Sequence, residues 1–356
     1  MHRTVWLTVI GFVLVTIVYL SIFSFISIAA KTPPNGQVSD SFSIIQITDT
    51  QFLSEYYPQL YNNLTSWIVA SRSAENTLMV VHTGDIVNVA NSTREWINAN
   101  YAMMLLYNNS VPYCWDAGNH DLIKDGADQA PNAFRYIGKN YPAFNTATMS
   151  GKPYWVSSIY DGTSTAVKFS FKNYKFMVIN VQYDGNMSVL AWMEKLIEDN
   201  PKVNIVVATH NFLNGNGGYG YSSNTRDLIW AREFESILDK HPNVFMTLSG
   251  HDVGEGSSAQ KNVAIGKSGF SREEVFFNMQ NQFDRQGAAV ARIYTFNVTY
   301  ASKPAATAYD YATAVFPAHA HGLTKMFHLY EDQDFYEVSP QNLSKRFSFY
   351  PHLISS

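Results

Sequence analysis

Charged side chains are scarce in this sequence, and cysteine is almost absent. Lys, Arg, Asp and Glu make up 15% of the 356 residues, against roughly 25% in typical soluble domains. The net charge is -4 and no run of Lys or Arg occurs, so the chain carries no electrostatic footprint for nucleic acid or an anionic membrane surface. Cys114 is the only cysteine, which excludes a disulfide framework or a thiolate metal cluster within one chain.

A long apolar run lies close to the N-terminus. Residues 5–30 contain neither charge nor proline, and at about 1.5 Å per helical residue such a run can cross a bilayer. A cleaved secretory signal has an apolar region of only about 7–15 residues, so a retained transmembrane anchor over residues 1–31 is favoured. Cleavage after Ser27-Ile28-Ala29 is the alternative. Both interpretations place the remaining chain outside the membrane, extracellular or periplasmic, or secreted.

Residues after the apolar run divide into three expected parts. Residues 32–40 are polar, contain proline and glycine, and are typical of a linker. The folded domain is expected over residues 41–301, with a C-terminal extension packed on it over residues 302–356, which show no clear periodicity. Six N-x-[ST] sequons are compatible with N-glycans on an exported protein. They begin at Asn63, Asn91, Asn108, Asn186, Asn297 and Asn342.

Strand-like and helix-like segments alternate through the expected domain. Short apolar runs predict strands, and apolar residues at helical spacing predict the helices between them. Two short runs around residues 172–174 predict a β-hairpin, and Ser92-Thr93-Arg94-Glu95 is a possible capping box for a helix. This alternation predicts an α/β fold with a buried sheet and helices outside it. The strands are expected at 42–47, 77–81, 111–115, 166–171, 175–181, 203–208, 244–248, 275–279 and 292–298, and the helices at 58–73, 92–107, 189–198 and 227–238.

Polar residues follow several of these strands at the point where each strand ends. Asp49, Asp85 and His120 follow the first three strands, and His210 and His251 follow two later ones. Ligands bind at the carboxyl ends of strands in α/β sheets, so we expect these residues to meet. One aspartate after a strand is usually a turn residue, but five such coincidences indicate a site. Carboxylate, amide and imidazole groups together suit Mn, Fe or Zn.

The order and spacing of these residues resemble the calcineurin-like metallophosphoesterases. The resemblance extends from about residue 42 to residue 298, and Gly118-Asn119-His120-Asp121 is its most specific element. It implies two facing mixed β-sheets flanked by helices, a four-layer sandwich, preceded here by the N-terminal transmembrane helix. The matching motifs are Asp49-Thr50-Gln51, Gly84-Asp85-Ile86-Val87, Gly118-Asn119-His120-Asp121, Thr209-His210-Asn211 and Gly250-His251-Asp252-Val253.

The resemblance also implies a role for each matching residue. Asp85 is expected to bridge two divalent ions. Asn119, His210 and His251 are expected to complete the shell of one ion, and Asp49 is expected to bind the other. Two such ions stabilise the attacking and leaving oxygens in phosphoryl transfer and activate a water. The resemblance thus implies hydrolysis of phosphomono- or diesters.

His120 is expected beside the leaving group, next to Asn119 as a second residue in contact with substrate. By resemblance it is a general acid or transition-state donor, with the neighbouring Asp121 orienting its ring. The alternative is that His120 only supports its loop. Arg226, beyond the glycine-rich residues 214–220, is a candidate partner for a substrate phosphate.

Two departures from the family pattern fall on the same ion. Gln51 stands where the family has its first histidine, and Val253 stands where it has its last. Gln51 offers a neutral oxygen and Glu255 is a possible substitute, whereas valine cannot bind a metal. We therefore expect one tight metal site and a second, weaker one. His319 and His321, two residues apart, are further candidates to complete the second site.

Two other classes of function compete with a two-metal hydrolase. One is a surface protein that keeps this fold as a binding or structural module and has lost catalysis with the two histidines. The other is a one-metal enzyme with a restricted substrate. Retention of buried polar ligands favours an active enzyme, because such groups cost folding free energy when they have no partner.

Overall fold

The computed structural model describes residues 41–122, 134, 138–172, 174–220, 225–252, 259–267, 269, 271–280, 289–297, 306–314 and 328–330. The chain divides between Ser39 and Asp40, and all described residues belong to the second unit. The predicted anchor over residues 1–31 and the linker over 32–40 therefore lie outside the described residues. In the described part, no helix is long and apolar enough to cross a membrane.

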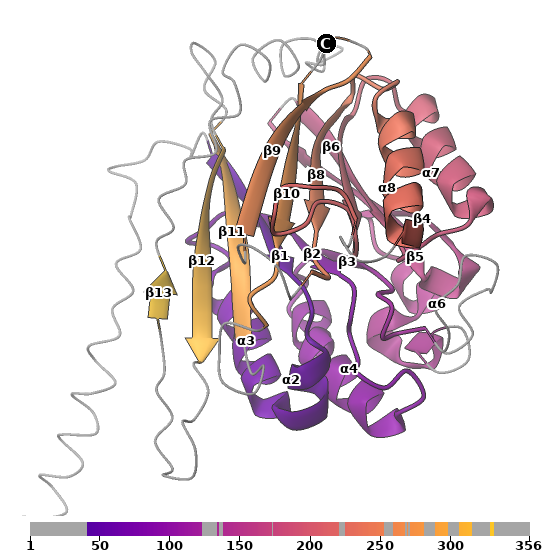
Figure 1. Ribbon diagram of the computed structural model, residues 1–356. Helices are drawn as coiled ribbons and strands as arrows, with labels where there is room; N and C mark the ends of the chain where they lie inside the picture. The colour runs from indigo at the N-terminus through magenta and orange to yellow at the C-terminus, as the bar shows by residue number, and fades with distance from the viewer. Residues whose placement is uncertain are drawn as a thin grey trace, which may run out of the picture. The chain divides into compact units, whose positions relative to one another are not determined.

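The first sheet contains six strands within the described residues, in the order β13-β12-β11-β1-β2-β3 (Figure 1). Strands β1, β2 and β3 run parallel, and β11, β12 and β13 continue the sheet antiparallel. Strand β12 lies beyond residue 301, in the segment without clear periodicity, and pairs with β11 along most of its length. The strands are β1 (Ser41–Ile47), β2 (Thr77–Thr83), β3 (Tyr113–Asp116), β11 (Ala289–Asn297), β12 (Ala306–Ala314) and β13 (His328–Tyr330).

The second sheet contains seven strands in the described chain, in the order β4-β5-β6-β7-β8-β10-β9. Its centre, β6 to β10, is parallel, while β4, β5 and β9 add antiparallel strands at the two edges. The predicted hairpin is the β5–β6 pair. The strands are β4 (Trp155–Ile159), β5 (Ser164–Phe171), β6 (Tyr174–Val181), β7 (Asn204–Thr209), β8 (Val244–Ser249), β9 (Ala259–Ile265) and β10 (Ser271–Phe277).

The helices pack against the two sheets. Apolar residues of α3 and α4 form one buried cluster with the first sheet, and those of α7 and α8 form another with the second. The α-helices are α2 (Gln51–Tyr56), α3 (Pro58–Ser71), α4 (Thr93–Asn108), α6 (Thr146–Met149), α7 (Met187–Asp199) and α8 (Thr225–Leu238). Short 3-10 helices are η1 (Gly138–Asn140), η2 (Pro142–Phe144) and η3 (Tyr160–Gly162).

A third apolar cluster contains residues of both sheets and is rich in aromatic rings. Phe42 of β1 stacks on Phe296 with ring centroids 5.0 Å apart and also meets Phe176 of the second sheet. Along β1, residues 42 and 44 belong to this cluster and residues 45 and 47 to the helix-side cluster, as the two-residue period of a strand requires. The prediction of an α/β fold with two mixed sheets and helices is confirmed.

A buried polar contact links the sheets near the ends of their strands. The side chain of Gln46 donates to Thr83 Oγ1 at 2.9 Å and to the Ser249 carbonyl at 3.1 Å. Its oxygen accepts from the Tyr294 hydroxyl at 2.7 Å. These bonds compensate the cost of burying an amide, so Gln46 fixes β1 against β2 and β8 directly before Asp49.

The predicted capping box is only half formed. Ser92 caps α4, because its Oγ accepts a hydrogen bond from the Glu95 backbone N–H at 3.4 Å. The Glu95 carboxylate does not accept a hydrogen bond from the Ser92 backbone N–H, which would complete the box. Its Oε2 accepts instead from the backbone N–H groups of Asn88 and Val89, at 2.7 and 2.9 Å. Glu95 therefore orders the loop before the helix.

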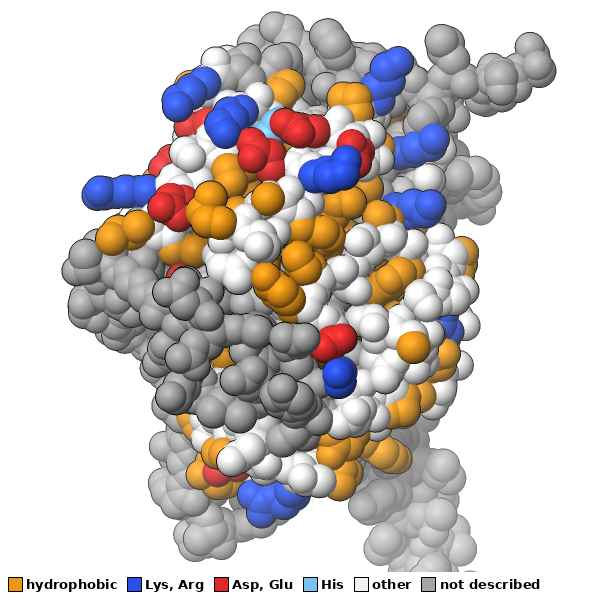
Figure 2. Space-filling model, turned by 90° about the vertical axis from the view of Figure 1, so that its right-hand side faces the viewer, with side chains coloured by type: hydrophobic (Ala, Val, Ile, Leu, Met, Phe, Trp, Pro, Cys, Tyr) orange, Lys and Arg blue, Asp and Glu red, His pale blue; other side chains and the backbone are white. Residues whose placement is uncertain are grey.

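The surface shown in Figure 2 agrees with the scarcity of charge in the sequence. On this face of the described chain, acidic and basic side chains are interspersed, and uncharged side chains cover most of the area between them. No patch of a single sign is visible among the described residues there.

Candidate metal centre

Six of the predicted site residues meet at the carboxyl ends of strands from both sheets. Asp49 follows β1, Asp85 follows β2 and Asn119 follows β3 of the first sheet, and His210 and His251 follow β7 and β8 of the second. Gln51 begins α2, two residues after Asp49. Ligand atoms of Asp49, Asp85 and His210 all lie within 4.8 Å of one another. The structure therefore brings these six residues together at the strand ends, and their roles as metal ligands stay predictions.

The imidazole of His210 is surrounded by groups that carry lone pairs. Its Nδ1 donates a hydrogen bond to the Thr83 carbonyl at 2.8 Å, so the outward-facing atom is Nε2. That Nε2 lies 3.0 Å from Asn119 Oδ1, 3.1 Å from His251 Nδ1 and 3.3 Å from Asp85 Oδ1. A histidine that binds a metal typically donates one ring N–H to a carbonyl, and the other ring nitrogen faces the remaining ligands. His210 has this arrangement.

A second set of oxygens includes Oδ2 of Asp85, whereas His210 faces Oδ1. The Nε2 atom of Gln51 donates to Asp85 Oδ2 at 3.0 Å, and Asp49 Oδ2 accepts from the Thr48 hydroxyl at 2.6 Å. Asp49 Oδ1 and Gln51 Oε1 are buried and have no hydrogen-bond partner among the described residues. Buried oxygens without a donor cost folding free energy, and a cation would compensate that cost. The residues present therefore fit divalent ions with mixed nitrogen and oxygen ligands, such as Mn, Fe or Zn.

The charges of these buried groups depend strongly on one another. Burial opposes protonation of His210, yet the adjacent Asp85 carboxylate raises its pKa to about 10. Burial likewise opposes ionisation of Asp85, but the charge on His210 lowers its pKa to about 2. Burial raises the pKa of Asp49 to about 7, and burial together with His210 lowers the pKa of His251 to about 3. His210 therefore holds a proton at the position that a cation would occupy, so protons and a cation compete for the same lone pairs.

The backbone is unusual at three of the candidate ligands. Asp49, Asp85 and His251 have φ values of 51°, 53° and 75°, in the left-handed region that side-chain-bearing residues seldom adopt. Strained conformations of this kind concentrate at functional sites, where the surrounding structure maintains them. Here each of them turns a side chain back toward the cluster directly after a strand.

Glycines in three of the motifs give the candidate ligands room. A Cβ atom at Gly118 would overlap the backbone nitrogen and Oδ1 of Asp85. A Cβ at Gly84 would lie 2.6 Å from Nδ1 of His210, and one at Gly250 would collide with Asp49. The glycine before each polar residue is therefore required by close approach to a ligand from another motif.

His120 lies beside this cluster, but a different group holds its ring. Its Nδ1 donates a hydrogen bond to the backbone carbonyl of Asn88 at 2.9 Å. The Asp121 carboxylate instead accepts from the backbone N–H groups of Ile86, Val87 and Gly118, at 2.8 to 2.9 Å. This corrects the expectation that Asp121 orients the ring. Asp121 is fully buried, and its carboxylate is already occupied by these three backbone donors.

The electrostatic surroundings favour a proton on His120. Burial opposes the positive charge, but the Asp85 carboxylate and the Asn88 carbonyl raise the pKa of His120 above its ordinary value. Burial and the nearby Asp85 charge raise the pKa of Asp121 to about 7. His120 is therefore suited to donate a proton, and Asp121 is suited to bracing the loop around the cluster.

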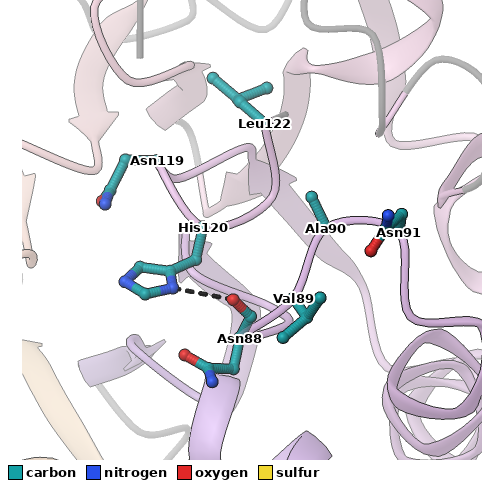
Figure 3. A pocket seen from close by; sticks show the side chains of 7 residues that line it. All are labelled: Asn88, Val89, Ala90, Asn91, Asn119, His120 and Leu122. Atoms are coloured by element: carbon teal, nitrogen blue, oxygen red, sulfur yellow. Dashed lines mark hydrogen bonds between the residues drawn. The ribbon is translucent and has the colours of Figure 1, made fainter. Parts of the chain in front are cut away.

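A cavity of about 480 Å³ opens next to His120 (Figure 3). Figure 3 shows Asn119 and His120 on one side of it and Ala90 and Asn91 on the other. Asn119 lines this cavity, and its side-chain oxygen also lies 3.0 Å from His210 Nε2, so the cavity adjoins the cluster. The described lining consists of Asn88, Val89, Ala90, Asn91, Asn119, His120 and Leu122.

Several candidates from the sequence cannot be placed at the site. Val253, Glu255, His319 and His321 lie outside the described residues. Arg226 lies in α8, but its side chain is also outside the described part. Their assigned roles stay predictions.

Three residues that contribute to the site escaped the sequence analysis. Thr83 and Asn88 act through backbone carbonyls, which leave no mark on residue type. Tyr183 follows β6, and its ring lies 5.3 Å from that of His251 and 6.0 Å from that of His210, measured between centroids. The only signal for Tyr183 is its position after a predicted strand.

Comparisons with known proteins complete these observations. A family model described as calcineurin-like phosphoesterase matches residues 42–255, more than half of the chain. The uncharacterized protein YvnB of Bacillus subtilis (strain 168) is 28% identical over 222 residues, which are 62% of this chain and 16% of that protein. This chain thus spans only a small part of that relative's length.

Two solved structures resemble the fold at low sequence identity. Purple acid phosphatase from yellow lupin (Lupinus luteus) seeds has a TM-score of 0.47 and 13% identity, over 76% of this chain and 52% of that one. The 5'-nucleotidase of Candida albicans has a TM-score of 0.41 and 12% identity, over 75% of this chain and 50% of that one. Likenesses at this level say nothing about substrate.

Proposed function

Because this chain belongs to the calcineurin-like phosphoesterase family, we propose that it is a metal-dependent hydrolase of phosphomono- or diesters. One observation carries the proposal: the lone pairs of Asp85, Asn119 and His251 converge within 3.3 Å of His210 Nε2. The Gln51 amide contacts the other carboxylate oxygen of Asp85, and Asp49 Oδ1 and Gln51 Oε1 are buried without a hydrogen-bond partner among the described residues. This donor set suits divalent ions and has no other evident use in the described fold.

The chain's own residues have separate tasks in this proposal. Divalent ions, when bound, would activate a water and neutralise charge on the phosphoryl group. Asp85, Asn119, His210 and His251 would hold one ion tightly, and Asp49, Gln51 and Asp85 a second one more weakly. His120 would protonate the leaving oxygen, with the Asn88 carbonyl fixing its ring so that Nε2 is left for the substrate.

The test is a hydrolysis screen on the fragment beginning near Asp40, supplied with Mn, Fe or Zn and with both ester types. We expect turnover, and we expect His120→Ala to lower kcat by roughly 10²–10⁴-fold without changing metal content. His241→Ala is a matched control, because His241 lies outside the cluster beside Glu194. If no ester is turned over with any ion, the protein is better described as a binding or structural module with this fold.

We also propose that the protein is held at a membrane by residues 1–31, with the phosphoesterase domain on the outer side. The support is the uncharged apolar run over residues 5–30 and five of the sequons, leaving out Asn91 because it lines the cavity. These five begin at Asn63, Asn108, Asn186, Asn297 and Asn342. The full chain should partition with membranes, and deletion of the residues before Lys31 should release active protein. Mature protein that begins after Ala29 would show a cleaved signal instead.

A further inference from the structure

The cavity beside His120 has an unusual distribution of charge. Among its described lining residues there is no Lys, Arg, Asp or Glu. Three are asparagines, and Val89, Ala90 and Leu122 supply carbon surface. His120, the proposed proton donor, is one of its lining residues, so a leaving group that His120 protonates would lie at this cavity.

Two carboxylates stand directly behind one wall of this cavity. Glu55 Oε2 accepts a hydrogen bond from the side-chain amide of Asn88 at 2.6 Å. Glu95 Oε2 accepts from the backbone N–H groups of Asn88 and Val89, at 2.7 and 2.9 Å. The donors of this wall are therefore already used, and the charge closest to it is negative. An anionic group in the cavity would meet this charge, and apart from His120 no described lining residue can carry a positive charge that would balance it.

The polar atoms that remain available are suited to neutral hydroxyl groups. Asn88 uses its side-chain nitrogen on Glu55, which leaves its Oδ1 as an acceptor. The exposed amide of Asn91 has no partner among the described residues and can both donate and accept. Hydroxyl groups can bond with such amides, while the apolar lining contacts their carbon skeleton.

We propose that this cavity is the leaving-group subsite and that it selects esters of uncharged, hydroxyl-bearing alcohols over esters whose leaving group carries a negative charge. The inference rests on the proposed function and adds the substrate class to it. The cavity volume of about 480 Å³ is large enough for a polyol or sugar.

A matched pair of substrates tests the charge preference. Glycerol 3-phosphate and 3-phosphoglycerate are both phosphomonoesters, and they differ in a hydroxymethyl against a carboxylate at the far end. We expect kcat/KM to be at least about tenfold higher for glycerol 3-phosphate, as one poorly screened repulsion requires. This ratio should shrink as salt is added.

Three variants test whether the preference comes from the wall behind the cavity. Glu55→Gln removes a negative charge but keeps an oxygen that can accept from Asn88, so the ratio should fall at least about threefold. Glu198→Gln removes one charge from the exposed face of α7, on the other sheet, and should leave the ratio unchanged. Asn91→Lys should raise kcat/KM for 3-phosphoglycerate specifically.

Binding provides a readout that does not depend on turnover. Calorimetric titration of His120→Ala with each ester, in the presence of Mn, should show tighter binding of glycerol 3-phosphate by a similar factor. Equal affinities for the two esters, or an affinity ratio that Glu55→Gln does not change, would overturn the proposed selectivity. Hydrolysis of both esters would still support the proposed function in that case. If neither ester is hydrolysed, the proposed function fails, and the titrations alone still decide the charge preference of the cavity.

Discussion

The Nε2 atom of His210 lies 3.1 Å from the Nδ1 atom of His251. Since Nδ1 of His210 is committed to the Thr83 carbonyl, only one proton can be shared across this gap in the absence of an ion. The Asp85 carboxylate keeps that proton on His210, and this charge, with burial, disfavours a second one on His251. The pair is therefore a place where protons and a divalent ion compete.

The first prediction is that metal stabilises the protein more as pH rises. Without metal, the proton on His210 stabilises the fold fully below about pH 6.5, and this contribution is lost as pH rises through about 10. Asp49, with its pKa raised to about 7, likewise loses a stabilising proton between about pH 4 and 7. The gap in Tm between Mn-loaded and chelated protein should therefore widen from pH 6 to pH 9. A gap that stays constant would contradict this competition.

The second prediction concerns the glycine that faces Asp85. Gly118→Ala introduces a Cβ that overlaps the backbone and carboxylate of Asp85, so Asp85 must move. We expect loss of bound metal and a fall in activity of more than about 100-fold. Gly151→Ala is the matched control, because nothing lies within 4 Å of a Cβ at that position. Metal content by elemental analysis separates the two variants, and equal content would refute the steric argument.

Much of this site could be predicted from sequence because its ligands come directly after strands. The expected strand before Asp49 ends at Ile47 in the structure, the strand before His210 ends at Thr209, and the strand before His251 ends at Ser249. The predicted partner of His120 was wrong: Asp121 is adjacent in sequence, but the ring of His120 is held by the Asn88 carbonyl, 32 residues away. The Asp121 carboxylate instead accepts from backbone N–H groups of Ile86, Val87 and Gly118. Strand β9 was missed because polar residues interrupt its pattern. Contacts made by backbone atoms are not encoded in residue type, so no pattern reveals them.

The third prediction separates stability from chemistry at two adjacent residues. Asp121→Ala removes the acceptor of three buried backbone N–H groups, and should lower the free energy of unfolding by roughly 3 kcal/mol or more. His120→Ala should change the unfolding free energy by less than about 1 kcal/mol, because the ring is only partly buried, yet it should remove most activity. Denaturant unfolding of both metal-free variants is the measurement. Similar losses of stability would mean that His120 has mainly a supporting role in its loop.

The last prediction is that the two sides of Asp85 bind metal unequally. One side offers Asn119, His210 and His251 with Asp85, whereas the other offers only Asp49 and the neutral Gln51 oxygen among the described residues. Fewer and weaker ligands mean lower affinity, so protein purified in dilute metal should hold close to one ion per chain. A second ion should enter only at high metal concentration or together with a phosphate ligand.

Two substitutions distinguish the sides. His251→Ala should weaken the tight ion by more than about 100-fold, whereas Gln51→Ala should leave it in place and weaken the second by about tenfold. His82→Gln is a comparison for Gln51→Ala, because His82 is buried behind the site and is not one of the proposed ligands. His82 contacts Thr50, which lies between Asp49 and Gln51. Elemental analysis and anomalous diffraction count the ions directly. Two fully occupied ions in dilute metal would contradict the predicted difference in affinity. That result would point to Glu255, His319 or His321 as the missing ligand, and alanine substitution of each residue would identify it.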